Sequence, residues 1–395
     1  MILFFAPNPN NFVKKEGYLQ RVLSIDRLFE NIERKYIHDI DDTEEIFNAL
    51  KKANTYYVHS VYEAEAITDL IEMFGSKFIV DLHGVVPEEE LFNGNKANFN
   101  KYNEIEKLIF RKCNNFIAVS NQMVEHFKSK YPESVDKNWI VLPIFDRSNH
   151  NIDIKSKDNK QIIYAGGSQK WQNIDLMKDI VKKNINDYKY TILTQDSSAF
   201  IDLSNKKNVL VKYVEKQEVY KFYKKSIMGF VLRDDILINR VSCPTKLIEY
   251  MDYGVVPIVK YANIGDFKAM GYKYVKYEDF SLNRISVSRL HEYAKFNQEL
   301  MIQYEKVSAE GMNLLKDTFQ KVSKIKILKK NESIMAISKN LVLILNNKKL
   351  IKDNKEKDNA INSLRNELHL MHSSRIWRTR SLLIRILCII YKRRR

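Results

Sequence analysis

A lysine and a glutamate, Lys246 and Glu249, lie three residues apart in the stretch SCPTKLIEYMDYGVVPIV. Pro244 favours the first turn of a helix and Gly254 favours the residue after one, so the stretch predicts a helix over roughly 244–253. Amides at a helix N-terminus attract phosphate, and a carboxylate further along the helix can accept hydrogen bonds from a ribose diol. The pattern therefore predicts a nucleoside diphosphate site, whereas on an ordinary surface helix the same pair would be a solvated ion pair.

Two further basic residues follow predicted strands in the same half of the chain. Lys170 lies in IYAGGSQKWQN, where Gly167 permits close approach of the backbone to a ligand, and Arg233 lies in FVLRDDILINRVSCPTK. We predict that both bind phosphate oxygens. The alternatives are a plain surface lysine, and a salt bridge from Arg233 to Asp234 or Asp235. A metal site at these aspartates is the weaker interpretation, because Lys170 and Arg233 already supply positive charge.

In the N-terminal half, IVDLHGVVPEEE places Asp81 and His83 at the carboxyl end of a predicted buried strand. Open α/β sheets bind ligands at this edge, so both residues are candidate site residues, with Asp81 orienting or charge-stabilising the His83 imidazole. The alternative is a structural histidine. Gly17 in NFVKKEGYLQR predicts a flexible loop on the same side, and Arg21 on the following helix is a candidate for a phosphate contact.

The elements that would position these residues alternate between strand and helix. Short apolar runs predict buried parallel strands, and amphipathic stretches between them predict crossover helices. A polar segment at 147–160, rich in Asn and Lys, separates two such halves. The sequence therefore predicts an α/β protein with two Rossmann-like domains facing across a cleft, over 1–150 and 158–325, and a helical extension over 331–395. The last helix before the extension, near GMNLLKDTFQKV, is predicted to cross back onto the first domain.

Composition limits the class of protein. The chain has 395 residues, 45% of them hydrophobic, so general disorder is excluded and two cores are expected. Lys and Arg exceed Asp and Glu by 65 to 49, and the net charge of +16 indicates an anionic partner. Three cysteines without paired spacing, and an N-terminus without a basic signal region, favour the cytoplasm. Nucleic acid is the weaker candidate partner, because outside the C-terminal end the basic residues are dispersed and no recognition motif is present.

The C-terminal end combines apolar and basic residues. The segment 375–395 contains no acid, and Arg385 interrupts its apolar run, which is therefore too short to span a bilayer. We predict that this segment binds the anionic inner surface of the cell membrane, as in a peripheral membrane protein. Packing on a partner helix and true insertion are the alternatives. An a/d-like apolar series in 350–372 predicts self-association.

The stretch around Glu249 resembles a motif of the retaining glycosyltransferases of the GT-B fold, family 4, of the type that builds bacterial surface polysaccharide. The resemblance is most specific at 229–259. The matching residues are Pro244, Lys246, Glu249, Tyr250, Met251, Gly254 and Pro257. The resemblance implies that Glu249 contacts the donor ribose and that backbone amides near Thr245 contact the pyrophosphate. One departure is Val241, where many family members have a second glutamate near the donor sugar.

The same resemblance implies a reaction. The stretch with Asp81 and His83 is similar to the family's D-x-H stretch, which places His83 beside the donor sugar and the reaction centre. Such an enzyme moves a sugar, with retention, from a nucleotide-diphosphate donor to a glycan acceptor, here predicted to be polyprenyl-linked. Lys170 and Arg233 would neutralise the leaving diphosphate, so no metal or other cofactor is expected. A GT-B nucleotide-sugar epimerase is the closest alternative.

Overall fold

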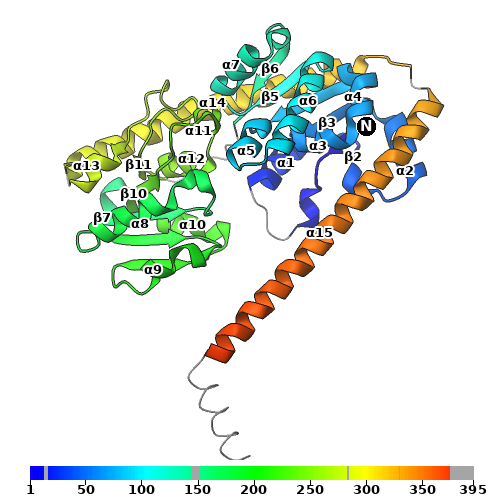
Figure 1. The fold of residues 1–395 in the computed structure, drawn as a ribbon. Coiled ribbons are helices and arrows are strands. Elements are labelled where there is room, and N and C mark those ends of the chain that lie inside the picture. The colour runs from blue at the N-terminus through cyan, green and yellow to red at the C-terminus, as the bar shows by residue number, and fades with distance from the viewer. Residues whose placement is uncertain (13–16, 144–151, 283, 329, 374–395) are drawn as a thin grey trace, which may run out of the picture.

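The computed structural model describes residues 1–12, 17–143, 152–282, 284–328 and 330–373. These residues form two α/β domains, each built on a six-stranded parallel sheet, and a long C-terminal helix (Figure 1). The α/β class, the two Rossmann-like domains and the helical extension are therefore confirmed. The predicted boundary segment 147–160 lies partly outside the described residues.

The first sheet has the strand order β2-β1-β3-β4-β5-β6, and neighbouring strands are parallel. Its strands are β1 (Ile2–Phe5), β2 (Arg34–Tyr36), β3 (Thr55–His59), β4 (Phe78–Leu82), β5 (Asn115–Ala118) and β6 (Asn138–Val141). Its α-helices are α1 (Gly17–Arg27), α2 (Thr43–Lys52), α3 (Val61–Ala64), α4 (Thr68–Phe74), α5 (Val86–Phe92), α6 (Lys96–Lys112) and α7 (Asn121–Lys130). The strand order reverses between β1 and β3, so a ligand crevice is expected at the carboxyl edge there.

The second sheet has the order β12-β11-β10-β7-β8-β9, with its reversal between β7 and β10. Its strands are β7 (Asp158–Ala165), β8 (Lys189–Leu193), β9 (Val209–Lys212), β10 (Ser226–Val231), β11 (Val256–Val259) and β12 (Val275–Lys276). Its shorter helices are α8 (Ile174–Lys183), α9 (Ile201–Ser204), α10 (Lys216–Tyr223), α11 (Leu237–Val241), α12 (Thr245–Asp252) and α13 (Tyr277–Ser281). This is the Rossmann order, in which the ligand lies beside the point of reversal.

The central strands are buried on both faces, as their continuous apolar runs predict. Every residue of β1, β3, β4 and β10 is buried. Successive residues of a strand point to opposite faces, so Leu3 and Phe5 join one core of the first domain while Ile2 and Phe4 join the other. Rigid, doubly covered sheets therefore position the loops at their carboxyl edges.

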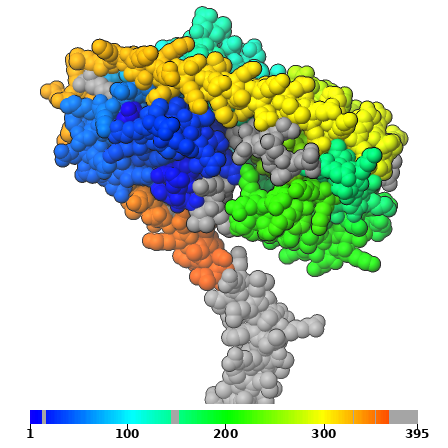
Figure 2. All heavy atoms as spheres, turned by 180° about the vertical axis from the view of Figure 1, so that it is seen from behind, coloured from blue at the N-terminus to red at the C-terminus, as the bar shows by residue number. Residues whose placement is uncertain are grey.

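One helix of 38 residues, α14 (Val287–Lys324), joins the two domains. Leu290 near its start packs in a core of the second domain, and Leu315 near its end packs in a core of the first. Gly311 permits the crossing, because a Cβ there would lie 2.4 Å from the carbonyl oxygen of Val141. The predicted crossing is confirmed, and Figures 1 and 2 show α14 running along both domains.

Segments at the carboxyl edges of the two sheets also make contact. Val241 of α11 is buried and belongs to a core of the first domain. The Ser120 hydroxyl donates a hydrogen bond of 2.6 Å to the carbonyl oxygen of Val241. Asp266 accepts hydrogen bonds from the backbone amides of Asn121 and Gln122, at the start of α7. The position where the family often has a second glutamate is therefore a packing contact between domains.

Introducing a glutamate there with Val241→Glu should lower the free energy of unfolding by about 3 kcal/mol or more, because a carboxylate would replace an apolar side chain in a core. Urea denaturation at pH 7 measures the loss. Val241→Ile is the control and should stay within about 1.5 kcal/mol of the wild type. A Val241→Glu protein as stable as the wild type would show that this position is open to solvent and available to a donor sugar.

The C-terminal helix α15 (Asn331–Ser373) begins on the first domain and then projects away from it (Figure 1). Near its start, Ile334, Ile337 and Leu341 pack in a core of that domain, and the helix contacts α2. Further along, the exposed apolar side chains are Leu343, Leu350, Ile351, Ile361 and Leu364. In the part of the chain that the structure describes, no helix is both long and apolar enough to cross a membrane. The predicted membrane segment 375–395 lies wholly outside that part, and self-association through 350–372 stays a prediction.

Candidate functional site

Three predicted segments meet at the switch point of the second sheet. Gly166 and Gly167 follow β7, and Arg233 lies two residues after β10. Helix α12 carries Lys246 and Glu249, and it packs against β11, the neighbour of β10. The residues therefore gather at the carboxyl edge where a sheet of this order binds its ligand.

Helix α12 spans Thr245–Asp252, one residue less at each end than predicted. Pro244 is its N-cap residue, and Gly254 has a φ of +64°, the left-handed conformation that ends a helix. Tyr250 packs into the space beside Gly229, where a Cβ would lie 2.4 Å from the ring. These local signals and this close approach fix the helix against the sheet.

Arg233 is a buried cation with an incomplete set of partners. Its side chain contacts Asn239 Oδ1 at 3.2 Å and Ser242 Oγ at 3.1 Å, both through Nη1. Its Nε is buried and has no hydrogen-bond partner among the described residues. Burial lowers the pKa of Arg233 to about 10, so the guanidinium stays charged at neutral pH.

The predicted alternative for Arg233, a salt bridge to one of the next two aspartates, is wrong. Asp234 pairs with Lys260, and Asp235 pairs with Arg240. Over the described ranges, no carboxylate lies within ion-pair distance of Arg233. The guanidinium is therefore charged, buried and not neutralised.

Lys246 is a second buried basic residue in the same place. Its Nζ lies 3.0 Å from Gln172 Oε1 and 4.0 Å from the centroid of the Tyr164 ring. A Cβ at Gly166 would lie 3.1 Å from this nitrogen, so the glycine leaves room for it. Burial, together with the positive charge of Arg233, holds the pKa of Lys246 well below its ordinary value. The alternative of a solvated ion pair with Glu249 is therefore wrong.

Arg233 and Lys246 together could bind a multivalent anion. Each is 7% exposed, and neither has an acidic partner in the described part of the chain. A buried charge is costly unless an opposite charge compensates it. A diphosphate has enough oxygen atoms to contact both basic side chains. Gly166 and Gly167, after β7, permit its close approach.

Glu249 is held by a buried tyrosine. The Tyr223 hydroxyl, at the end of α10, donates a hydrogen bond of 2.8 Å to Glu249 Oε2, and the ammonium of Lys216 lies 3.5 Å from Oε1. Burial, and next the charge of Glu249, raise the pKa of Tyr223 well above its ordinary value, so the phenol keeps its proton. The carboxylate is 30% exposed and retains lone pairs for the hydroxyl groups of a ligand.

Tyr223→Phe should weaken nucleotide binding about tenfold, because Glu249 loses the donor that orients it. Isothermal titration with the best-bound nucleotide measures this change. The neighbouring Tyr220→Phe is the matched control, with an expected affinity within twofold of the wild type. Equal affinities for the two variants would remove Tyr223 from the site.

Four further predicted site residues are Lys170, Thr245, Gly167 and Gly17. Lys170 is exposed, and its ammonium lies 4.8 Å from the centroid of the Phe92 ring, at the end of α5 in the first domain. Thr245 is the first residue of α12, and Gly167 follows β7 by two residues. Gly17 is exposed at the start of α1, with open space around it. Contacts of these four residues with a ligand stay predictions.

Asp81 and Arg21 form a buried ion pair beneath the carboxyl edge of the first sheet. Arg21 Nε lies 2.9 and 2.7 Å from the two carboxylate oxygens, and Nη2 lies 2.6 Å from Oδ1. Burial alone would raise the pKa of Asp81, but the charge of Arg21, the nearby His59 and the hydrogen bonds from Arg21 outweigh it and hold the pKa well below its ordinary value. Arg21 is 1% exposed and also donates to the Leu142 carbonyl oxygen. The prediction that Arg21 contacts a phosphate is therefore wrong.

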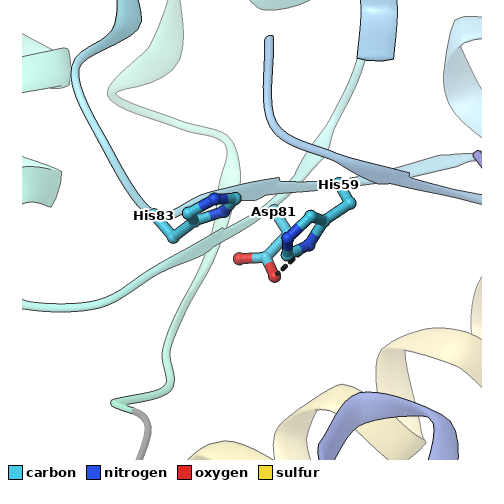
Figure 3. A group of neighbouring side chains, drawn as sticks. All are labelled: His59, Asp81 and His83. Atoms are coloured by element: carbon cyan, nitrogen blue, oxygen red, sulfur yellow. Dashed lines mark ion pairs between the residues drawn. The ribbon is translucent and has the colours of Figure 1, made fainter. Parts of the chain in front are cut away.

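His83 stacks on His59, a histidine that is not among the predicted site residues (Figure 3). The ring centroids are 4.2 Å apart and the ring planes differ by 24°. His59 Nδ1 lies 3.0 Å from the Tyr57 hydroxyl and 3.6 Å from Asp81 Oδ2. Asp81 therefore lies next to two side chains, Arg21 and His59. Burial, together with the charge of His59, lowers the pKa of His83 to about 3, so its imidazole is neutral. The available signal was a histidine at the end of the predicted strand TYYVHS.

The ligand atoms of His59, Asp81 and His83 all lie within 4.8 Å of one another, close enough to consider a metal ion. A shared ion would have to lie near the plane of both imidazoles, where their nitrogen lone pairs point. Two rings stacked at 24° keep those planes apart at this distance. Both oxygens of Asp81 already accept hydrogen bonds from Arg21. As these side chains lie, they do not fit a single ion.

The two domains and the helix that crosses them define the GT-B fold, and solved structures of that fold are similar to this chain. Sucrose-phosphate synthase from Thermosynechococcus elongatus gives a TM-score of 0.59 at 11% identity, over 81% of this chain and 99% of that one. Anabaena HepE, in complex with UDP and glucose, gives 0.57 at 11% identity, over 82% and 99%. No protein-family model and no curated protein sequence matches the chain.

Proposed function

We propose that the protein is a glycosyltransferase that moves a sugar, with retention, from a nucleotide-diphosphate donor to a glycan acceptor. The observation that carries the proposal is the pair of buried basic side chains, Arg233 and Lys246, at the switch point of a Rossmann sheet. A diphosphate would compensate both charges. The solved complex of HepE with UDP and glucose supports a nucleotide sugar as the donor.

The geometry suggests how the residues would share the work. Glu249, oriented by Tyr223, would accept hydrogen bonds from the ribose hydroxyls. Arg233 and Lys246 would stabilise the charge that develops on the leaving diphosphate, the contribution that is usually largest in such reactions. The neutral imidazole of His83 would lie beside the sugar, where an oxocarbenium-like centre forms and an extra positive charge would be unfavourable. Contacts between the domains would keep out water, which competes as an acceptor.

The decisive experiment is a thermal-shift panel of nucleoside diphosphates and nucleotide sugars, followed by a transfer assay with whichever binds. We expect one diphosphate to raise the melting temperature, and Glu249→Ala to abolish most of that shift without unfolding the chain. Glu278→Ala, an exposed glutamate of the same domain, is the matched control. A folded protein that binds no nucleotide would contradict the proposal. Interconversion of two nucleotide sugars without transfer would favour the epimerase.

The proposal extends to the acceptor, a polyprenyl-linked glycan at the inner face of the cell membrane, in synthesis of surface polysaccharide. The acid-free segment 375–395 supports this extension, and α15, which precedes it in the sequence, projects from the first domain (Figure 1). A basic, apolar surface segment binds anionic lipid through both its charge and its buried apolar area.

Truncation after Leu370 should abolish sedimentation with liposomes that contain anionic phospholipid, because it removes the basic and apolar residues together. The full chain should bind these liposomes at low salt and bind purely zwitterionic liposomes weakly. Nucleotide affinity is the internal control and should not change on truncation. Undiminished liposome binding by the truncated chain would contradict the membrane role.

A further inference from the structure

We propose that His59 is a positioning residue that holds the His83 imidazole in one orientation, ready to hydrogen-bond a hydroxyl group of the donor sugar. The inference rests on the proposed function, which supplies the sugar. His59 ends β3 and is 3% exposed, so it cannot itself lie on the surface of a site. Its contact with His83 is a ring stack across the two neighbouring strands β3 and β4 (Figure 3).

His59 is fixed by a chain of buried hydrogen bonds that begins at Arg21. Arg21 orients the carboxylate of Asp81, and the Tyr57 hydroxyl donates to Asp81 Oδ2 at 2.7 Å. Because the Tyr57 proton is directed at the carboxylate, the tyrosine oxygen is free to accept a proton from His59 Nδ1, 3.0 Å away. The bond fixes the ring plane of His59.

His83 has a weaker anchor of its own, because a backbone hydrogen bond at Asp81 is the smallest of the contributions to its pKa. It lies just beyond β4, in the turn that leads to α5, and its Nδ1 is buried without a hydrogen-bond partner among the described residues. The face of His59 packs against the His83 ring at a centroid distance of 4.2 Å, with the ring planes 24° apart. A fixed imidazole with an unused nitrogen suits a neutral hydroxyl group, which can donate or accept as required.

Two substitutions separate the stack from the hydrogen bond. His59→Phe keeps an aromatic face against His83 but cannot donate to Tyr57, whereas His59→Ala removes both. We expect His59→Ala to lower kcat at least tenfold. The KM for the donor and the affinity for the nucleoside diphosphate should stay within threefold of the wild type. His59→Phe should keep kcat within about threefold. If His59→Ala does not fold, His59→Leu takes its place, because it fills the space without a flat ring.

A second readout needs no substrate and therefore tests the inference even if the proposed function fails. In protein labelled at its eight histidines, the resonance of His83, assigned with His83→Gln, should stay constant between pH 5 and 8. It should remain constant in His59→Phe and should shift or broaden in His59→Ala, as the ring samples other orientations. An unchanged His83 resonance in His59→Ala, or equal losses of kcat in the two variants, would overturn the inference. A lower melting temperature of His59→Ala with kcat unchanged would reduce His59 to a structural residue.

Discussion

Asp81→Leu should lower the free energy of unfolding by about 3–5 kcal/mol, because it leaves the guanidinium of Arg21 buried without a counter-charge. Arg21 is 1% exposed, and without Asp81 its only other described hydrogen bond is to the carbonyl oxygen of Leu142. Tyr57 also loses its acceptor. Urea denaturation followed by circular dichroism at pH 7 measures the loss.

The double variant Arg21→Met/Asp81→Leu separates the cost of an orphaned charge from the value of the pair. Replacement of a buried ion pair by apolar side chains of similar size is often neutral, so the double variant should recover most of the lost stability. Asp158→Asn is the control for an exposed pair, since Asp158 and its partner Lys189 are 40% and 62% exposed, and it should cost less than about 1 kcal/mol. A double variant no more stable than Asp81→Leu would mean that packing, and not charge, decides the effect.

The same pair predicts a pH dependence. The pKa of Asp81 is lower in the folded protein than in the unfolded chain, so the contribution of the carboxylate is fully present above its unfolded pKa of about 3.9 and is lost as pH falls below that value. The stability of the wild type should therefore approach that of Asp81→Leu between about pH 4 and pH 2. A difference that stays constant over this range would contradict the assigned ion pair.

The fold was predictable because its signals are local. Continuous apolar runs appear wherever a strand is covered on both faces, and β3 and β10 are buried along their whole length. Pro244 and Gly254 predict each end of α12 to within one residue. The fixed φ of proline and the tolerance of glycine for a positive φ are properties of the residues themselves. The crossing of α14 was predictable from its position, although the role of Gly311 depends on what lies opposite it.

The site was only partly predictable because its partners come from distant segments. Nothing near Arg21 in the sequence shows that its counter-charge is Asp81, sixty residues away. The assignment of Arg21 to a phosphate failed for that reason, and Tyr223, twenty-six residues before Glu249, was missed. The neutral state of His83 depends on burial and on a stacked neighbour from another strand, which spacing along the chain does not reveal.

Arg233→Leu should weaken binding of the nucleoside diphosphate about 100-fold, while the stability of the free protein stays within about 1 kcal/mol of the wild type. A hydrogen bond to a charged group contributes about 1.5–3 kcal/mol, and Arg233 offers Nε and its remaining guanidinium protons to the diphosphate. In the free protein its contacts are two neutral oxygens, those of Asn239 and Ser242. Their loss is offset by relief of the cost of a buried charge.

Arg240→Leu is the matched control, because Arg240 is the same residue type on the same stretch but 49% exposed and paired with Asp235. Its nucleotide affinity should stay within twofold of the wild type. Titration calorimetry gives the affinity, and thermal melts without ligand give the stability. If Arg233 instead served packing, Arg233→Leu would lower the melting temperature and leave the nucleotide affinity unchanged. Loss of binding without loss of stability is expected only where a buried cation is kept for an anion that the folded chain does not itself supply, and Lys246→Met should then behave in the same way.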